Sequence, residues 1–170
     1  MAFSAQRTVH HTPAETAEAL ASEEFHRSVI ESLGGTLVSF SREGDAEGPM
    51  TVTTVRSAPA RQLPEAAQKF IGDHVQVEQV ERWEAPEADG SRSGTTTITV
   101  AKAKATAEAS MHLRAAGAGT EYAVQGSLSC RIPLVGSKLA TKAEPMVGKV
   151  VERQAREIDG WLSTLSLIHI

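Results

Sequence analysis

The sequence predicts an α+β fold in which a curved antiparallel sheet of about seven strands wraps around a long C-terminal helix. Between residues 36 and 132, apolar and polar residues alternate along several segments, which is typical of half-buried strands. From 135 to 164, apolar residues instead recur every three or four positions, as in an amphipathic helix. A chain of 170 residues is about one domain in size, so sheet and helix are expected to share one core.

The first strand is expected at residues 2–12, before two short helices. Pro13 stops the strand because proline lacks a backbone donor, and Thr12 before it is a suitable N-cap for the first helix. A second start follows at Ser22, where two glutamates suit the positive end of a helix. Gly34 and the glycine after it end this helix.

Six further strands complete the expected sheet. They are predicted at 36–41, 50–56, 74–84, 93–101, 102–114 and 120–132, separated by turns rich in glycine and aspartate. A short helix that begins at Pro64 is expected between 59 and 72.

One strand has an unusually small inner face. Every second residue from Ala101 to Ala109 is alanine, followed in the same parity by Met111 and Leu113, while the other parity is polar. Small side chains under a long helix leave space, which is either filled by neighbouring side chains or forms a pocket.

The terminal helix carries one unfavourable residue. Pro145 cannot donate the helical hydrogen bond, so we expect a short turn at 136–143 and then the main helix, or a kink at the proline. The expected apolar stripe consists of Leu139, Ala143, Met146, Val150, Gln154, Ile158, Trp161 and Leu165. Residues 165–170 look like a translated sequencing adapter, so we expect the domain to comprise residues 2–164.

Composition excludes several function classes. The net charge of −4 argues against a nucleic-acid binder that relies on phosphate contacts, and no apolar stretch is long enough to span a membrane. Cys130 is the single cysteine, so neither an intrachain disulfide nor a cysteine zinc cage can form, and on the apolar face of its strand it is expected to behave as a small hydrophobe. The N-terminus lacks the apolar core of a secretory signal, and we expect a cytoplasmic protein without a strong oligomer signal.

Motifs for metal, cofactor or nucleophilic chemistry are missing. His10 and His11 are adjacent on a predicted strand, so they should point to opposite faces and could not share a metal. No HExxH or CxxC spacing occurs, and we expect neither metal nor cofactor. The segment Gly90–Gly94 resembles a nucleophile elbow, but Arg92 occupies the position that serine would need.

The candidate site is therefore a pocket between sheet and terminal helix. Its candidate lining residues are Phe70, Trp83, Ala105, Ala107, Ala109, Met111, Tyr122, Val124, Met146 and Val150. Glu81 shares a strand face with Trp83. If that face is the inner one, Glu81 is a buried carboxylate with a raised pKa and a candidate acid or base; otherwise it is a solvated charge. The parity of Val75 and Val77 favours the inner face, whereas Val80 suggests a bulge or a switch of face.

This element order is similar to the helix-grip fold, and the chain resembles the START-like, Bet v 1-like (SRPBCC) superfamily. More closely, it resembles an actinobacterial domain-of-unknown-function family, number 2505. The segments that carry the resemblance are SLGG at 32–35, LPEAAQKFIGDHVQVEQVERW at 63–83, GTTTITV at 94–100 and RIPLVGSKLATKAEPMVGKVVERQAREIDGWL at 131–162.

The resemblance implies a fold but no particular reaction, because many superfamily members hold an apolar ligand between sheet and helix while others are enzymes. Our first hypothesis is non-catalytic binding of an apolar small molecule, such as a lipid or a polyketide-like compound. The alternative is a cyclase- or hydrolase-type enzyme that uses Glu81 or a histidine as acid or base. A protein interaction module is a further alternative, favoured only by the lack of catalytic motifs.

Overall fold

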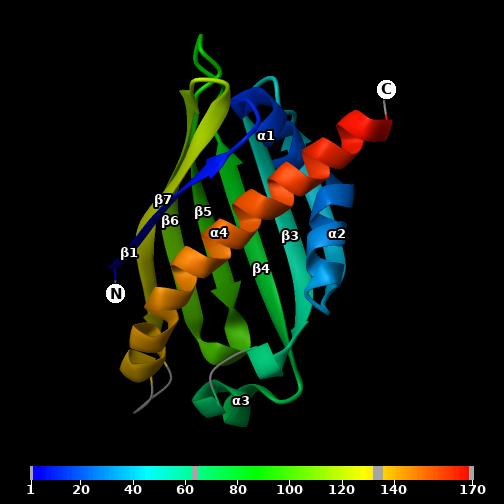
Figure 1. Ribbon diagram of the computed structural model, residues 1–170. Helices are drawn as coiled ribbons and strands as arrows, with labels where there is room; N and C mark the ends of the chain where they lie inside the picture. The colour runs from blue at the N-terminus through cyan, green and yellow to red at the C-terminus, as the bar shows by residue number, and fades with distance from the viewer. Residues whose placement is uncertain (1, 63–64, 132–135, 169–170) are drawn as a thin grey trace.

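The computed structural model describes residues 2–62, 65–131 and 136–168, in which a seven-stranded antiparallel sheet is crossed by one long helix (Figure 1). The strands are β1 (Ala2–Val9), β2 (Thr36–Gly44), β3 (Met50–Pro59), β4 (His74–Trp83), β5 (Arg92–Val100), β6 (Ala105–Ala116) and β7 (Gly119–Cys130). The α-helices are α1 (Pro13–Leu20), α2 (Glu23–Ser32), α3 (Glu65–Ile71) and α4 (Gly136–Ile168), with short 3-10 turns η1 (Ala60–Gln62) and η2 (Ala101–Ala103). The predicted fold class and the two short helices after the first strand are confirmed.

The sheet order is β1-β7-β6-β5-β4-β3-β2, so the first strand pairs with the last. Helix α4 runs diagonally across the concave face of the curved sheet, and α1 and α2 lie near its C-terminal half (Figure 1). Helix α3 lies at the opposite end of the sheet (Figure 1). None of the described helices is long and apolar enough to cross a membrane.

Local capping explains why the chain turns from β1 into two helices. Thr12 accepts a hydrogen bond from the backbone N–H of Glu15, and the Glu15 carboxylate accepts one from the backbone N–H of Thr12, which together form a capping box. The Ser22 hydroxyl accepts from the N–H of Phe25 at the start of α2. These bonds satisfy donors that have no partner within the helix itself.

The strand register arranges the concave face in rows that cross the sheet. One row, the central row, consists of Val52, Glu81, Thr96, Ala109, Gly126 and Phe3, on β3, β4, β5, β6, β7 and β1. The next row toward α3, the lower row, consists of Thr54, Gln79, Ile98, Ala107 and Leu128. Glu81 therefore lies on the inner face, and Val80 points to the convex face without a bulge or a switch of face.

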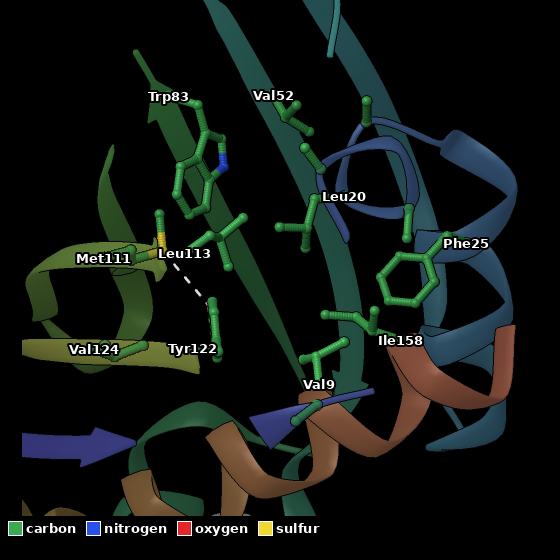
Figure 2. Close-up of a cluster of buried hydrophobic side chains, with 14 of the residues drawn as sticks. Val9, Leu20, Phe25, Val52, Trp83, Met111, Leu113, Tyr122, Val124 and Ile158 are labelled. Carbon is green, nitrogen blue, oxygen red and sulfur yellow. Dashed lines mark hydrogen bonds between the residues drawn. The ribbon is translucent and has the colours of Figure 1, made fainter. Parts of the chain in front are cut away.

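The apolar side chains under the helices form two separate clusters. The main cluster fills the space between α1, α2, the C-terminal half of α4 and the adjacent part of the sheet. Figure 2 shows Tyr122 and Met111 hydrogen-bonded to each other at one side of it. The second cluster, at the α3 end of the sheet, consists of Ala60, Ile71, Val75, Val77 and Ala103. The central row borders the main cluster, which includes its Val52 and Ala109, and the lower row lies between the two clusters.

Helix α4 corrects two expectations. It is a single helix through Pro145 rather than a turn followed by a helix. The proline is exposed, so the hydrogen bond that it cannot make is lost at a position that water can reach. Val150 is 60% exposed and does not face the sheet, because the buried side of the helix is centred on Val151, Ala155 and Ile158.

Candidate functional site

A chain of polar side chains lies on the concave face where the two clusters leave a gap. Arg56 Nη1 donates to Gln79 Oε1 at 3.1 Å, and Gln79 Nε2 donates to Glu81 Oε1 at 3.0 Å. The second Glu81 oxygen accepts a 3.2 Å hydrogen bond from the indole N–H of Trp83. Gln79 Nε2 also donates to Thr96 Oγ1 at 3.2 Å. All five residues lie on β3, β4 and β5, so the rigid sheet positions the whole chain.

The orientation of the Gln79 amide follows from its neighbours. A guanidinium can only donate, so the atom that faces Arg56 must be the amide oxygen, and the amide nitrogen must face Glu81 and Thr96. The bond from Arg56 to Gln79 and the bond from Gln79 to Glu81 therefore run in the same direction, toward the carboxylate. With Trp83 donating from the other side, both carboxylate oxygens already accept hydrogen bonds within the protein.

Burial dominates the electrostatics of Glu81. Its side chain is 3% exposed, and removal from water raises the pKa of the carboxyl, although the charge of His26, the Trp83 hydrogen bond and the charge of Arg56 act in the opposite direction. Burial also lowers the pKa of Arg56 and raises the pKa of Tyr122, to which the charge of Glu81 contributes. The Tyr122 hydroxyl donates to Gln154 Oε1 at 3.3 Å, which links the sheet to α4.

Apolar side chains on the β5, β6 and β7 side of this polar chain are incompletely buried. Ala105, Ala107, Ile98, Val100, Leu128 and Cys130 all belong to the inner face, yet each remains partly accessible. In the main cluster, by contrast, Met111, Leu113 and Tyr122 are at most 2% exposed. The inner face is thus closely packed from the α1 end to the central row, and partly open from the lower row toward α3.

A groove of about 830 Å³ borders this region between α4 and the β1–β7 edge of the sheet. Phe3 and Gly126 line it from the concave face, and Pro145 and Gly148 line it from the helix. Ala2, Ser4, Ser110 and Gln125 complete the lining at the sheet edge and the convex face. The small residues Gly126 and Gly148 keep the helix and the sheet edge free of bulky side chains at this point.

The structure separates the expected lining residues into groups. Trp83, Met111, Tyr122 and Val124 lie inside the main cluster, while Ala109 lies at its border, 9% exposed. Ala105 and Ala107 lie in the partly open rows. Val150 points away from the sheet, as described above. The side chains of Phe70 and Met146 lie outside the part of the structure that is described.

Sequence reasoning missed Arg56, Gln79 and Thr96. Gln79 has the same strand parity as Val75 and Val77, so a polar residue on the inner face could have been noticed. Arg56 likewise continues the parity of Met50 and Val52. Their pairing, however, depends on the register between strands, which no local pattern specifies.

The two adjacent histidines do not point to opposite faces, because β1 ends at Val9. His10 Nδ1 lies 2.8 Å from Asp159 Oδ2, and His11 Nδ1 lies 3.0 Å from Asp159 Oδ1. The backbone N–H of His10 also donates to Asp159 Oδ1 at 2.7 Å. This cluster fastens the end of β1 to α4. The described residues contain no group of histidine, cysteine and carboxylate side chains arranged to hold a metal ion.

Comparison with known proteins agrees with this architecture. Residues 4–162 match the family described as a protein of unknown function (DUF2505). The chain belongs to this family. No curated protein sequence matches it significantly.

Several solved structures share the fold of this DUF2505 chain. The protein TTHA0849 from Thermus thermophilus is 14% identical, with 98% of this chain and 99% of that chain covered and a TM-score of 0.64. The Zhui aromatase/cyclase from Streptomyces sp. R1128 is 13% identical, with coverages of 96% and 93% and a TM-score of 0.53. Norcoclaurine synthase from Thalictrum flavum is 9% identical, with coverages of 98% and 96% and a TM-score of 0.51. At these identities the likeness is one of fold alone.

Proposed function

We propose that this DUF2505 protein binds an apolar small molecule between the concave face of its sheet and α4, without catalysing a reaction. One observation carries the proposal. The apolar side chains of the lower row, Ala107, Ile98 and Leu128, remain partly accessible although a helix crosses the same face of the sheet. A protein core normally buries such side chains, and apolar surface left accessible in a concave region is typical of a ligand site.

The composition of this region supports an apolar ligand with few polar contacts. Ala105 and Ala107 present almost no side-chain volume, and we take the ligand, a flat or extended molecule, to lie over them. The polar chain from Arg56 to Glu81 borders that space at β3 and β4. Pockets of this type combine a mainly apolar wall with a small number of fixed polar groups.

The first experiment is native mass spectrometry of the purified protein, followed by analysis of its organic extract. An additional mass that is lost on denaturation would support the proposal and identify the ligand class. The neutral fluorophore N-phenyl-1-naphthylamine tests the apo protein directly, because its emission rises when it enters an apolar site. If neither a retained mass nor saturable fluorescence is found, the space is packed or inaccessible and the proposal fails.

A cavity-filling substitution locates the site. Ala107→Phe adds a ring to a partly open position, and we expect it to weaken fluorophore binding at least about tenfold by occupying the space. Ala123→Phe is the matched control, because Ala123 belongs to β7 but points to the convex face. Equal binding by both variants and the unsubstituted protein would place the fluorophore elsewhere and contradict this location.

An enzyme that uses Glu81 as acid or base is the second candidate. The observation that favours it is the burial of Glu81, which raises the pKa of its carboxyl toward the range useful for proton transfer. Against it, both carboxylate oxygens already accept hydrogen bonds from Gln79 and Trp83. If the extract identifies a ligand, incubation with that compound and Glu81→Gln as the comparison would detect turnover that depends on the carboxyl.

An interaction module has no support of its own. Among the described side chains, Val38 and Val150 are the large apolar ones that are mainly exposed, and they lie on β2 and α4. Two isolated apolar side chains do not make the contiguous patch that marks a binding surface.

A further inference from the structure

Among the described residues, Arg56 is a cationic side chain that borders the partly open part of the concave face. It lies on β3 in the inner-face parity, one position beyond the lower row, and its guanidinium reaches Gln79 in that row. Its side chain is neither fully buried nor solvated, since the residue is partly accessible on the concave face. An arginine placed in this way combines a fixed position with access to the concave face of the sheet.

The hydrogen-bonding capacity of the polar chain is unevenly distributed. Both amide protons of Gln79 are engaged, by Glu81 and Thr96, and both oxygens of Glu81 accept hydrogen bonds. The described hydrogen bonds of Arg56 engage one of its five N–H donors, through Gln79. A ligand that approaches this chain therefore meets donors from Arg56, rather than an accessible acceptor on Glu81.

The charge of Arg56 is also incompletely neutralised. Among the described residues, no carboxylate oxygen lies within 4.0 Å of its guanidinium, and Glu81 is separated from it by the Gln79 amide. A partly desolvated cation with spare donors, beside an apolar space, favours an anion with planar acceptor geometry, because a carboxylate can accept two parallel bonds from a guanidinium.

We propose that the ligand is an apolar molecule with one anionic end, of which a carboxylate is the best match, and that Arg56 binds that end. The apolar body then lies over β5, β6 and β7 toward Ala107 and Gly126. Arg56 and Ala107 are three strands apart, which corresponds to about 14 Å at the usual strand spacing. This inference rests on the proposed function and adds the chemical class of the ligand to it.

Two related fluorophores separate the two proposals. N-phenyl-1-naphthylamine and 1-anilinonaphthalene-8-sulfonate share the same aromatic body, but only the second carries an anion. Both are titrated into the folded protein, and decanoic acid and decanol are then compared as competitors for the neutral fluorophore. We expect the sulfonate to bind more tightly than the neutral compound, and the acid to compete better than the alcohol.

The variant that tests the residue is Arg56→Met, which keeps most of the side-chain length and removes the charge. We expect at least about a tenfold loss of affinity for the sulfonate and for decanoic acid, and less than about a twofold change for the neutral fluorophore. Arg56→Lys should restore part of the loss. Arg114→Met is the matched control, because Arg114 is exposed on the convex face and pairs with Glu121.

The outcomes are distinguishable. If the neutral fluorophore binds and Arg56→Met changes both fluorophores equally or neither, the anionic ligand is refuted while the apolar site stands. If neither fluorophore binds the unsubstituted protein, the proposed function itself fails. Retained binding of the neutral compound by Arg56→Met also shows that the variant is folded, so a loss of sulfonate binding cannot result from unfolding.

Discussion

Arg92 provides the sharpest test of how the loops at the α1 end of the sheet are held. Its side chain is 3% exposed, and its guanidinium donates to three carbonyl oxygens: Ala46 at 2.7 Å, and Gly48 and Glu84 at 2.8 Å. Nε of Arg92 is buried without a hydrogen-bond partner among the described residues. The side chain thus joins the β2–β3 hairpin to the loop after β4.

The expected effect of Arg92→Met follows from these contacts. Three hydrogen bonds from a charged donor contribute about 1.5–3 kcal/mol each, or about 5–9 kcal/mol in total. Desolvation of a guanidinium that has no carboxylate partner costs several kcal/mol and offsets part of this gain. The three carbonyls belong to surface loops that can be rehydrated in the variant. We therefore expect Arg92→Met to lower the free energy of unfolding by about 2–4 kcal/mol.

Urea unfolding at pH 7, followed by the fluorescence of Trp83 and Trp161, measures this difference. Arg114→Met is again the control, and as an exposed substitution it should change the free energy of unfolding by less than about 0.5 kcal/mol. An Arg92→Met variant as stable as the unsubstituted protein would refute the reasoning, since it would mean that burial of the cation costs as much as its hydrogen bonds contribute.

Two further predictions concern pH. Burial alone would raise the pKa of Asp159, but hydrogen bonds from His10 and His11 outweigh it and lower that pKa below its ordinary value of 3.8. The contribution of Asp159 to stability is then present above that value and is lost as the pH falls through the folded-state pKa. In urea unfolding, Asp159→Asn should therefore be less stable than the unsubstituted protein by about 1–2 kcal/mol at pH 7, and this difference should shrink in acid. A difference that does not change with pH would contradict this. The stability that Glu81 contributes changes with pH in the opposite direction. Its folded-state pKa is raised above 4.5, so its contribution to stability is complete below that pH and is lost as the pH rises. Relative to the unsubstituted protein, Glu81→Gln should therefore gain stability from pH 4.5 to pH 8 in thermal unfolding scans, and a constant difference between the two would show that Glu81 titrates normally.

The sequence predicts the architecture well because both hydrophobic periods are strong. The alternation that ends in Trp83 and the helical repeat through Ile158 place the strands and the terminal helix, although the repeat assigned Val150 to the wrong side of that helix. The face of Glu81 was ambiguous, because Val80 is apolar but lies on the convex face opposite the polar partners Thr53 and Thr97. A β-branched residue suits a strand on either face, so its hydrophobicity does not determine the parity.

The site was harder to predict because its contacts join distant parts of the chain. Arg56 and Gln79 are bonded only because β3 and β4 adopt one particular register. His10 and His11 share a carboxylate on α4 because the strand ends earlier than its residue pattern suggests. Arg92 entered the sequence analysis only as the residue that disqualifies a hydrolase motif, and nothing local indicated its three carbonyl partners.

The pairing of β1 with β7 has a consequence for synthesis of the chain. β1 leaves the ribosome before the other strands of the sheet, and its partner β7 follows about 110 residues later. At a translation rate of about 5–20 residues per second, the first strand stays without its neighbour for roughly 5–20 s. During that interval both of its edges can pair with other chains. The polar residues that alternate along β1, among them Ser4, Gln6 and Thr8, make such pairing less favourable until the sheet can be completed.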